Sequence, residues 1–285
     1  MVAGHGLTFR YRWQLALRLE TIAQPDQCES NAAIKEVSTM KFLVIKHAIV
    51  EGLGIFEQFC QKAGIAVDYV ELEKGDRFPS LEGYAALCVM GGPMNVGEEA
   101  DYPWLVEEKA LIRQAVQELQ LPYLGVCLGA QLLADALGGE VSAMSAPEVG
   151  LLPITLTDAG QQHPLTAGLP DTLKVLQWHG QAVQKLPPGA TVLASSAHCP
   201  VQAYAVSVGG ESPQESRVFG LQFHSEVSAA TIKEWVEIPA YRADLDVTLG
   251  PTGCEALTQA VRERLPIMNH EANVIFDNFL KIVKG

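Results

Sequence analysis

Apolar and polar positions from Met40 onward alternate in blocks, first with the period of a strand and then with that of a helix. Residues 42–45 form a short apolar run that predicts a strand. Residues 54–62 place four apolar side chains on one helical face, and residues 67–72 predict a second strand. The order strand, helix, strand is typical of a βαβ unit, so we expect these two strands to be parallel.

The next segments continue this alternation. Residues 85–90 are apolar along their whole length, as expected of a central parallel strand that is covered on both faces. Residues 102–119 predict an amphipathic helix, because their apolar positions fall on one stripe. Residues 122–126 predict a further strand, and residues 128–137 predict a helix that ends at the glycine pair 138–139.

The last third of the chain contains several short apolar runs between turn residues, followed by two helical patterns. The expected strands are residues 152–156, 173–177, 191–195, 201–206 and 218–223, and the expected helices lie around 232–236 and 272–283. No internal repeat or low-complexity linker divides the chain. We therefore expect one α/β domain over residues 40–285, an open and mostly parallel sheet with helices on both faces. Its motif-bearing core is 40–226, and 227–285 form a C-terminal helical extension.

Residues 1–39 differ from the rest, because they contain no complete strand and helix unit. Three interpretations are open: a translated upstream or expression-derived segment before a natural start at Met40, an Arg-rich transit peptide, or a functional arm. We favour the first, since the first clear strand begins directly after Met40. We expect this N-terminal extension to be disordered or peripheral.

Composition narrows the class of protein. Apolar residues make up 48% of the 285 residues and charged residues 19%, which supplies enough apolar surface for a folded core. The net charge of −13 would repel phosphate backbones and anionic membranes, so we expect no nucleic-acid and no membrane partner. No segment approaches the roughly 20 continuous apolar residues that a membrane-spanning helix needs.

The six cysteines contain no C-x-x-C pair, so their spacing gives no indication of zinc, an iron-sulfur cluster or a dithiol redox centre. We expect reduced thiols in a cytoplasmic protein, with no metal and no cofactor. Four histidines also lack metal-ligand spacing, and we expect surface or hydrogen-bonded core positions for them. These are His47, His163, His198 and His270. Trp104 and Trp235 are expected to be core residues or groove walls.

One cysteine stands in a context that indicates chemistry. Residues 125–129 read Gly-Val-Cys-Leu-Gly, the thiol analogue of the G-x-S-x-G nucleophile elbow, and they join a predicted strand to a predicted helix. Such a turn would expose the sulfur of Cys127 at a helix N-terminus, where the positive end of the dipole favours the thiolate. The free N–H of Leu128 would point at an oxyanion. We therefore expect Cys127 to be a nucleophile.

A thiolate nucleophile needs a base in a fixed tautomer. The best-placed candidate is His224, because it follows an apolar strand and is separated from Glu226 by one residue. We expect His224 to act as the base and Glu226 to orient it.

The two motifs together resemble those of the class I (triad) glutamine amidotransferases, which carry a G-x-C-x-G-x-Q elbow and a late F-H-x-E. Here they stand at residues 125–131 and 223–226. The resemblance covers about residues 40–226 and implies a flavodoxin-like fold. It also implies that Cys127 attacks the amide of glutamine, that His224 is base and then acid, and that Glu226 orients the imidazole.

The resemblance assigns further residues. It makes Gly92 the second oxyanion donor beside Leu128, and it makes Gln131 a substrate contact. Residues 178–180, with His179 and Gly180, look like the family's loop that meets the α-amino and carboxylate end of the substrate. Ser225 departs from the proline usual between His and Glu, which removes no catalytic group.

The acceptor and the exact substrate stay open at this point. Only 59 residues follow Glu226, too few for a synthetase domain, so we expect a free-standing relative of the GMP synthase amidotransferase domain. Ammonia would then go to a separate synthetase or acceptor protein. One alternative is a γ-glutamyl hydrolase or transpeptidase that acts on γ-glutamyl amides, and another is a non-catalytic regulatory module. A related cysteine peptidase would carry histidine where this chain has Leu128.

Overall fold

We analysed a computed structural model of the chain, which describes residues 40–250 and 252–285. Residues 1–39 lie outside the described residues, and so does our expectation for that segment. No helix in the described part of the chain is both long enough and apolar enough to cross a membrane.

The described strands form one sheet in the order β2-β1-β3-β4-β9-β8-β7-β5-β6. Neighbouring strands from β2 to β9 pair in parallel, and those from β9 to β6 pair antiparallel. The strand bounds are β1 Lys41–Lys46, β2 Ala66–Glu71, β3 Ala86–Val89, β4 Tyr123–Val126, β5 Glu140–Leu156, β6 Thr172–Lys185, β7 Ala190–Ser195, β8 Ala203–Val206 and β9 Val218–Leu221. The predicted α/β fold with a mostly parallel central sheet is confirmed, and β8, β7, β5 and β6 extend it by antiparallel pairing.

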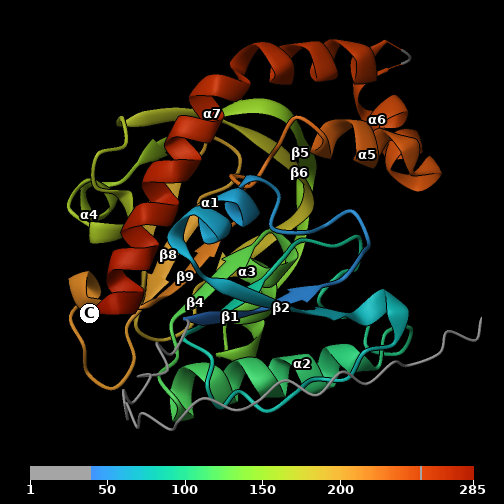
Figure 1. Ribbon diagram of the computed structural model, residues 1–285. Helices are drawn as coiled ribbons and strands as arrows, with labels where there is room; N and C mark the ends of the chain where they lie inside the picture. The colour runs from blue at the N-terminus through green and yellow to red at the C-terminus, as the bar shows by residue number, and fades with distance from the viewer. Residues whose placement is uncertain (1–39, 251) are drawn as a thin grey trace, which may run out of the picture. The chain divides into compact units, whose positions relative to one another are not determined.

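Helices cover both faces of the parallel strands (Figure 1), as expected from their apolar runs. Helices α1 and α7 lie on one face, and α2 and α3 bury their apolar stripes on the other. The helix bounds are α1 Ile55–Ala63, α2 Trp104–Arg113, α3 Leu128–Ala136, α4 Asp158–Gln161, α5 Thr231–Glu237, α6 Pro239–Leu249 and α7 Gly253–Lys284. Helix α2 continues into a π-helical turn over Gln114–Glu118. Together they correspond to the predicted helix at 102–119, although the observed helix begins two residues later than predicted.

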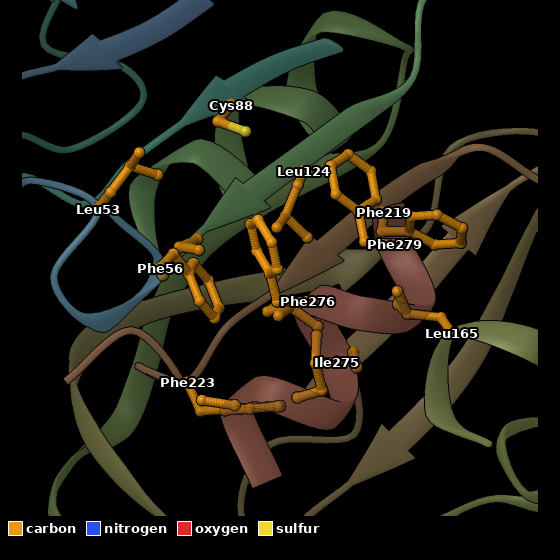
Figure 2. Close-up of a cluster of buried hydrophobic side chains, with 14 of the residues drawn as sticks. Leu53, Phe56, Cys88, Leu124, Leu165, Phe219, Phe223, Ile275, Phe276 and Phe279 are labelled. Atoms are coloured by element: carbon orange, nitrogen blue, oxygen red, sulfur yellow. The ribbon is translucent and has the colours of Figure 1, made fainter. Parts of the chain in front are cut away.

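The C-terminal half of α7 completes the core on its face of the sheet. Figure 2 shows Phe276 and Phe279 pointing from this helix toward side chains of the strands and of α1. The ring of Phe279 meets that of Phe42 at 6.2 Å between centroids, and Phe276 meets Phe56 at 5.7 Å. The C-terminal half of α7 therefore packs against β1 and α1.

Two predicted strands are much longer than expected. Strand β5 has 17 residues and β6 has 14, and the two pair antiparallel. The sequence predicted strands only at 152–156 and 173–177. The first half of β5 is largely exposed and rich in small residues, so it lacks the alternation that marks a half-buried strand. A register irregularity between Ala143 and Glu148 further interrupts the pattern.

The C-terminal extension is also more helical than expected. The predicted helices at 232–236 and 272–283 correspond to α5 and to the second half of α7. Helix α6 was not predicted, and α7 begins at Gly253 and continues through Pro266. A proline inside a helical pattern normally ends or kinks the helix, but α7 continues on both sides of Pro266, whereas the predicted helix covered only 272–283.

Candidate active site

A cavity of about 430 Å³ opens where the carboxyl ends of the parallel strands meet the C-terminal helices. Ligands bind at this edge in open α/β sheets. The cavity is lined by Glu51, Gly92, Pro93, Met94, Asn95, Cys127, Gln131, Trp178, His179, Gly180, Gln181, His224, Trp235 and Tyr241. The structure therefore brings most of the residues selected from the sequence to one place.

Cys127 occupies a strained turn between β4 and α3. Its φ of 51° and ψ of −107° lie in a region that non-glycine residues rarely adopt. The flanking glycines are required by close contact, because a Cβ on Gly129 would lie 2.0 Å from the carbonyl oxygen of Val89. The prediction of an exposed sulfur is wrong in degree: Cys127 is 6% exposed and reaches solvent through the cavity.

His224 lies beside the elbow and is held by a short hydrogen bond. Its Nδ1 donates to Oε1 of Glu226 at 2.6 Å, which leaves Nε2 for proton exchange. Burial opposes the charged imidazole, but Glu226 and then Cys127 outweigh it and hold the pKa of His224 well above its usual value. The Trp235 ring packs edge-on against the imidazole at 4.8 Å between centroids. The structure thus joins the three predicted triad residues.

Two backbone amides near Cys127 are unused. Within residues 40–250 and 252–285, the N–H groups of Gly92 and Leu128 donate to no protein acceptor. Leu128 is the first residue of α3, where amides lack intrahelical partners, and Gly92 lines the cavity after β3. These are the two amides that the sequence assigned to an oxyanion hole, and that role stays a prediction.

Gln131 is fixed near the nucleophile. Its Nε2 donates to the carbonyl of Gln181 at 3.0 Å and to Oε1 of Gln222 at 3.1 Å. The amide of Gln222 in turn lies 3.8 Å from the sulfur of Cys127. Gln222 was not selected from the sequence, although its place between β9 and His224 could have indicated it.

His179 and Gly180 line the cavity, but they lie within strand β6 and not in the loop that the resemblance implied. The His179 ring is engaged by the carbonyl of Gln181 at 2.8 Å and by Glu148 at 3.1 Å. Glu148 also accepts from Ser196 and Gln202. Both ring nitrogens of His179 are therefore already hydrogen-bonded within the protein. The predicted contact of His179 with a substrate would involve its backbone groups, and it stays a prediction.

Glu148, His179 and Cys199 have donor atoms close enough to hold a metal ion. Their hydrogen bonds already account for the arrangement, because the carboxylate accepts from three side chains and the Cys199 thiol donates to the carbonyl of Val201. Nothing in this geometry calls for a metal.

The sequence missed a second carboxylate at the site. Glu51, in the loop after β1, is buried, and its oxygens lie within 4.8 Å of donor atoms of His224 and Glu226. Tyr241 of α6 donates to Glu51 Oε1 at 3.3 Å. Its position after a parallel strand could have indicated Glu51, whereas Tyr241 belongs to a helix that the sequence did not predict.

Burial, together with the neighbouring Glu226, raises the pKa of Glu51 to about 6, although His224 and Tyr241 act in the opposite direction. The folded chain therefore binds a proton here more tightly than the unfolded chain, whose glutamate has a pKa of 4.5. The free energy of unfolding falls as the pH rises between these two values, by about 2 kcal/mol.

We expect Glu51→Gln to stabilise the fold above pH 6, because glutamine carries no charge to desolvate. The gain over the parent chain should approach about 2 kcal/mol at pH 7.5 and vanish near pH 4. Urea unfolding at the two pH values measures it, with the exposed Glu118→Gln as control. An equal difference at both pH values would contradict a buried, ionised Glu51.

The remaining histidines and tryptophans agree with the expectations for them. His47 and His163 are buried and hydrogen-bonded, and His198 and His270 are exposed. Trp235 is both core and cavity wall.

A family model and the sequences of known proteins both relate this chain to glutamine amidotransferases. The family model for glutamine amidotransferase class-I matches residues 47–237. The glutamine amidotransferase-like protein YfeJ of Salmonella typhimurium is 32% identical over 202 residues, which cover 70% of this chain and 80% of that protein. One subunit of the glutamine-hydrolyzing GMP synthase of Sulfolobus acidocaldarius is 31% identical over 57% of this chain and 78% of its own length.

Solved structures give the same picture. A glutamine amidotransferase from Thermotoga maritima superimposes with a TM-score of 0.73 at 28% identity, covering 87% of this chain and 99% of that one. One from Methylobacillus flagellatus superimposes with a TM-score of 0.72 at 26% identity, covering 86% and 95%.

Proposed function

The chain belongs to the class I glutamine amidotransferases, and from this premise we propose that it cleaves the side-chain amide of glutamine or of a γ-glutamyl amide through a thioester on Cys127. The observation that carries the proposal is the 2.6 Å bond from His224 to Glu226 beside a cysteine in a strained elbow. All three groups are present, which argues against a non-catalytic regulatory module.

In this mechanism His224 takes the proton of the Cys127 thiol, and the thiolate attacks the amide carbon. The N–H groups of Gly92 and Leu128 stabilise the negative oxygen of the tetrahedral intermediate. His224 then gives its proton to the leaving nitrogen, the C–N bond breaks and a γ-glutamyl thioester remains. Water, deprotonated by His224, attacks the thioester and releases glutamate and the free thiol. Glu226 keeps the imidazole in the tautomer that each step needs.

We propose that the released ammonia is passed to a separate synthetase or acceptor protein. Support comes from the similarity to single subunits of archaeal GMP synthases, those of Sulfolobus acidocaldarius and Saccharolobus solfataricus. We also propose a cytoplasmic location, because the five described cysteines are free thiols.

A larger γ-glutamyl amide is the second candidate substrate. Three aromatic rings, of Trp178, Trp235 and Tyr241, pack together along the cavity, and Trp235 touches the imidazole that protonates the leaving nitrogen. An apolar wall on this side of His224 suits a leaving amine that is larger than ammonia. Hydrolysis and transfer both pass through the same thioester, so the two candidates share one site.

Substrate profiling tests the proposal and separates the candidates. The chain is incubated with glutamine and with γ-glutamyl-p-nitroanilide, with and without an added amine acceptor, and ammonia, p-nitroaniline and γ-glutamyl products are measured. We expect release from at least one substrate and none with Cys127→Ala. If the chain releases nothing from either, or if release persists without the thiol, the proposed function is wrong.

A further inference from the structure

His47, in the loop after β1, connects the oxyanion loop to helix α2. Its Nδ1 donates to the carbonyl oxygen of Gly91 at 2.9 Å, and its Nε2 lies 3.0 and 3.1 Å from the two carboxylate oxygens of Glu108. The ring also packs on Trp104, at 5.5 Å between centroids. None of these three side chains lines the cavity.

The pair is fully buried, with both side chains 0% exposed. Burial opposes the charged imidazole, but Glu108, the bond to Gly91 and Glu51 together raise the pKa of His47. A carbonyl oxygen only accepts hydrogen bonds, so Nδ1 must carry a proton. A buried ion pair contributes little to stability, because the cost of desolvation offsets its attraction. The pair is therefore better explained by the group that it holds in place.

The group held in place is the planar peptide that joins Gly91 to Gly92. In a trans peptide the C=O and the following N–H point in opposite directions, and the described residues contain no cis peptide. A carbonyl of Gly91 bound to His47 therefore directs the N–H of Gly92 away from His47. That N–H has no acceptor among the described residues, and Gly92 lines the cavity.

Contact distances show how closely His47 approaches this peptide. A Cβ added to Gly92 would lie 2.6 Å from Cβ of His47 and 3.0 Å from a methyl group of Leu128. A Cβ on Gly91 would lie 2.7 Å from a carboxylate oxygen of Glu51. A side chain would therefore not fit at either glycine, and His47 lies directly against Gly92.

We propose that His47, held by Glu108, is a positioning residue that fixes the Gly91–Gly92 peptide with its N–H aimed into the cavity. His47 does not touch the substrate. The proposal rests on the proposed function, because it is there that this N–H stabilises the oxyanion. Its effect should therefore appear in the chemical step and not in substrate binding.

Two substitutions of His47 separate its two hydrogen bonds. The side-chain amide of asparagine can reproduce the donor at Nδ1, so His47→Asn keeps the bond to Gly91 and loses that to Glu108. The longer glutamine reproduces Nε2, so His47→Gln keeps the contact with Glu108 and loses that with Gly91. His163→Gln is the matched control, because His163 is also buried and donates to a backbone carbonyl, that of Pro213.

With γ-glutamyl-p-nitroanilide or glutamine we expect His47→Gln to lower kcat about 10²-fold with little change in KM, the size of effect seen when one oxyanion donor is lost. His47→Asn should stay within a few-fold of the parent chain, and so should His163→Gln. Alkylation of Cys127 by iodoacetamide should proceed at the parent rate in all three variants, because this displacement forms no oxyanion. A purely structural role would slow alkylation as well.

The ¹³C shift of the Gly91 carbonyl, measured by NMR, tests the positioning without any turnover. It should move in His47→Gln and stay near the parent value in His47→Asn. The proposal is overturned by an unchanged shift in His47→Gln, by equal losses of kcat in the two His47 variants, or, if His47→Gln does not fold, by a loss above tenfold in folded His47→Asn. If the parent chain releases no product from any γ-glutamyl substrate, the proposed function fails while the shift still decides the positioning.

Discussion

Cys127→Ala is expected to reduce turnover of glutamine and γ-glutamyl amides by about 10⁴-fold or more, with little change in the fold. Among the described residues that line the cavity, Cys127 provides the only thiol, and no serine or threonine hydroxyl lines it, so the substitution removes the thioester step. Only one sulfur atom is lost from a side chain that borders the cavity, so the effect on packing is small. Product release under saturating substrate and the melting temperature measure the two outcomes.

Labelling with a glutamine-like electrophile checks which thiol reacts. Burial raises the pKa of Cys60 to about 12 and that of Cys199 to about 11, and it raises the pKa of Cys88 as well. These three are therefore thiols, and not reactive thiolates, at neutral pH. Peptide mapping should find the label on Cys127, and a label on one of the other three would refute the assignment.

His224→Ala is expected to cost about a hundredfold more activity than Glu226→Ala. His224 transfers protons directly, whereas Glu226 orients and polarises the imidazole. Glu51 lies beside the same imidazole and can partly replace the lost carboxylate. Values of kcat for the two variants at saturating substrate measure the difference, and equal residual rates would contradict these roles.

The double variant Glu51→Gln/Glu226→Gln tests the contribution of the second carboxylate. If Glu51 supports His224 when Glu226 is neutral, the double variant should lose more than the product of the two single losses. The single variant Glu51→Gln retains Glu226 and should lose only a few-fold. Multiplicative losses would show that Glu51 acts independently of the imidazole.

The parallel half of the sheet and the nucleophile elbow could be predicted because each follows from a local rule. Residues 85–90 are apolar throughout since the strand is covered on both faces, and the order of strands and helices dictates parallel pairing. The two glycines around Cys127 reflect contacts with backbone atoms of neighbouring segments, and only glycine satisfies those contacts. Such constraints are visible in the sequence.

The β5–β6 hairpin and the C-terminal wall of the cavity could not be predicted, because they depend on distant partners. The exposed half of β5 is held by pairing with β6 rather than by an apolar face of its own. Tyr241 reaches Glu51 from a point 190 residues further along the chain. Neither contact leaves a periodic signal in the local sequence.

The same limit applies to the charged groups around the triad. His47 was expected at a surface or a hydrogen-bonded core position, and its two partners, Gly91 and Glu108, come from different elements. Apart from its position after a parallel strand, nothing in the sequence separates Glu51 from a surface glutamate. A carboxylate becomes part of a site through the groups that the fold places around it.

The packing of α7 also has a consequence for biosynthesis. Ribosomes make the chain from its N-terminus, so strands β1, β3, β4 and β9 exist before the helix residues that cover one of their faces. Those residues, among them Ile275, Phe276 and Phe279, come more than fifty positions after Leu221, the end of β9. The nascent chain therefore keeps this apolar face of the sheet uncovered until these residues of α7 have been synthesised.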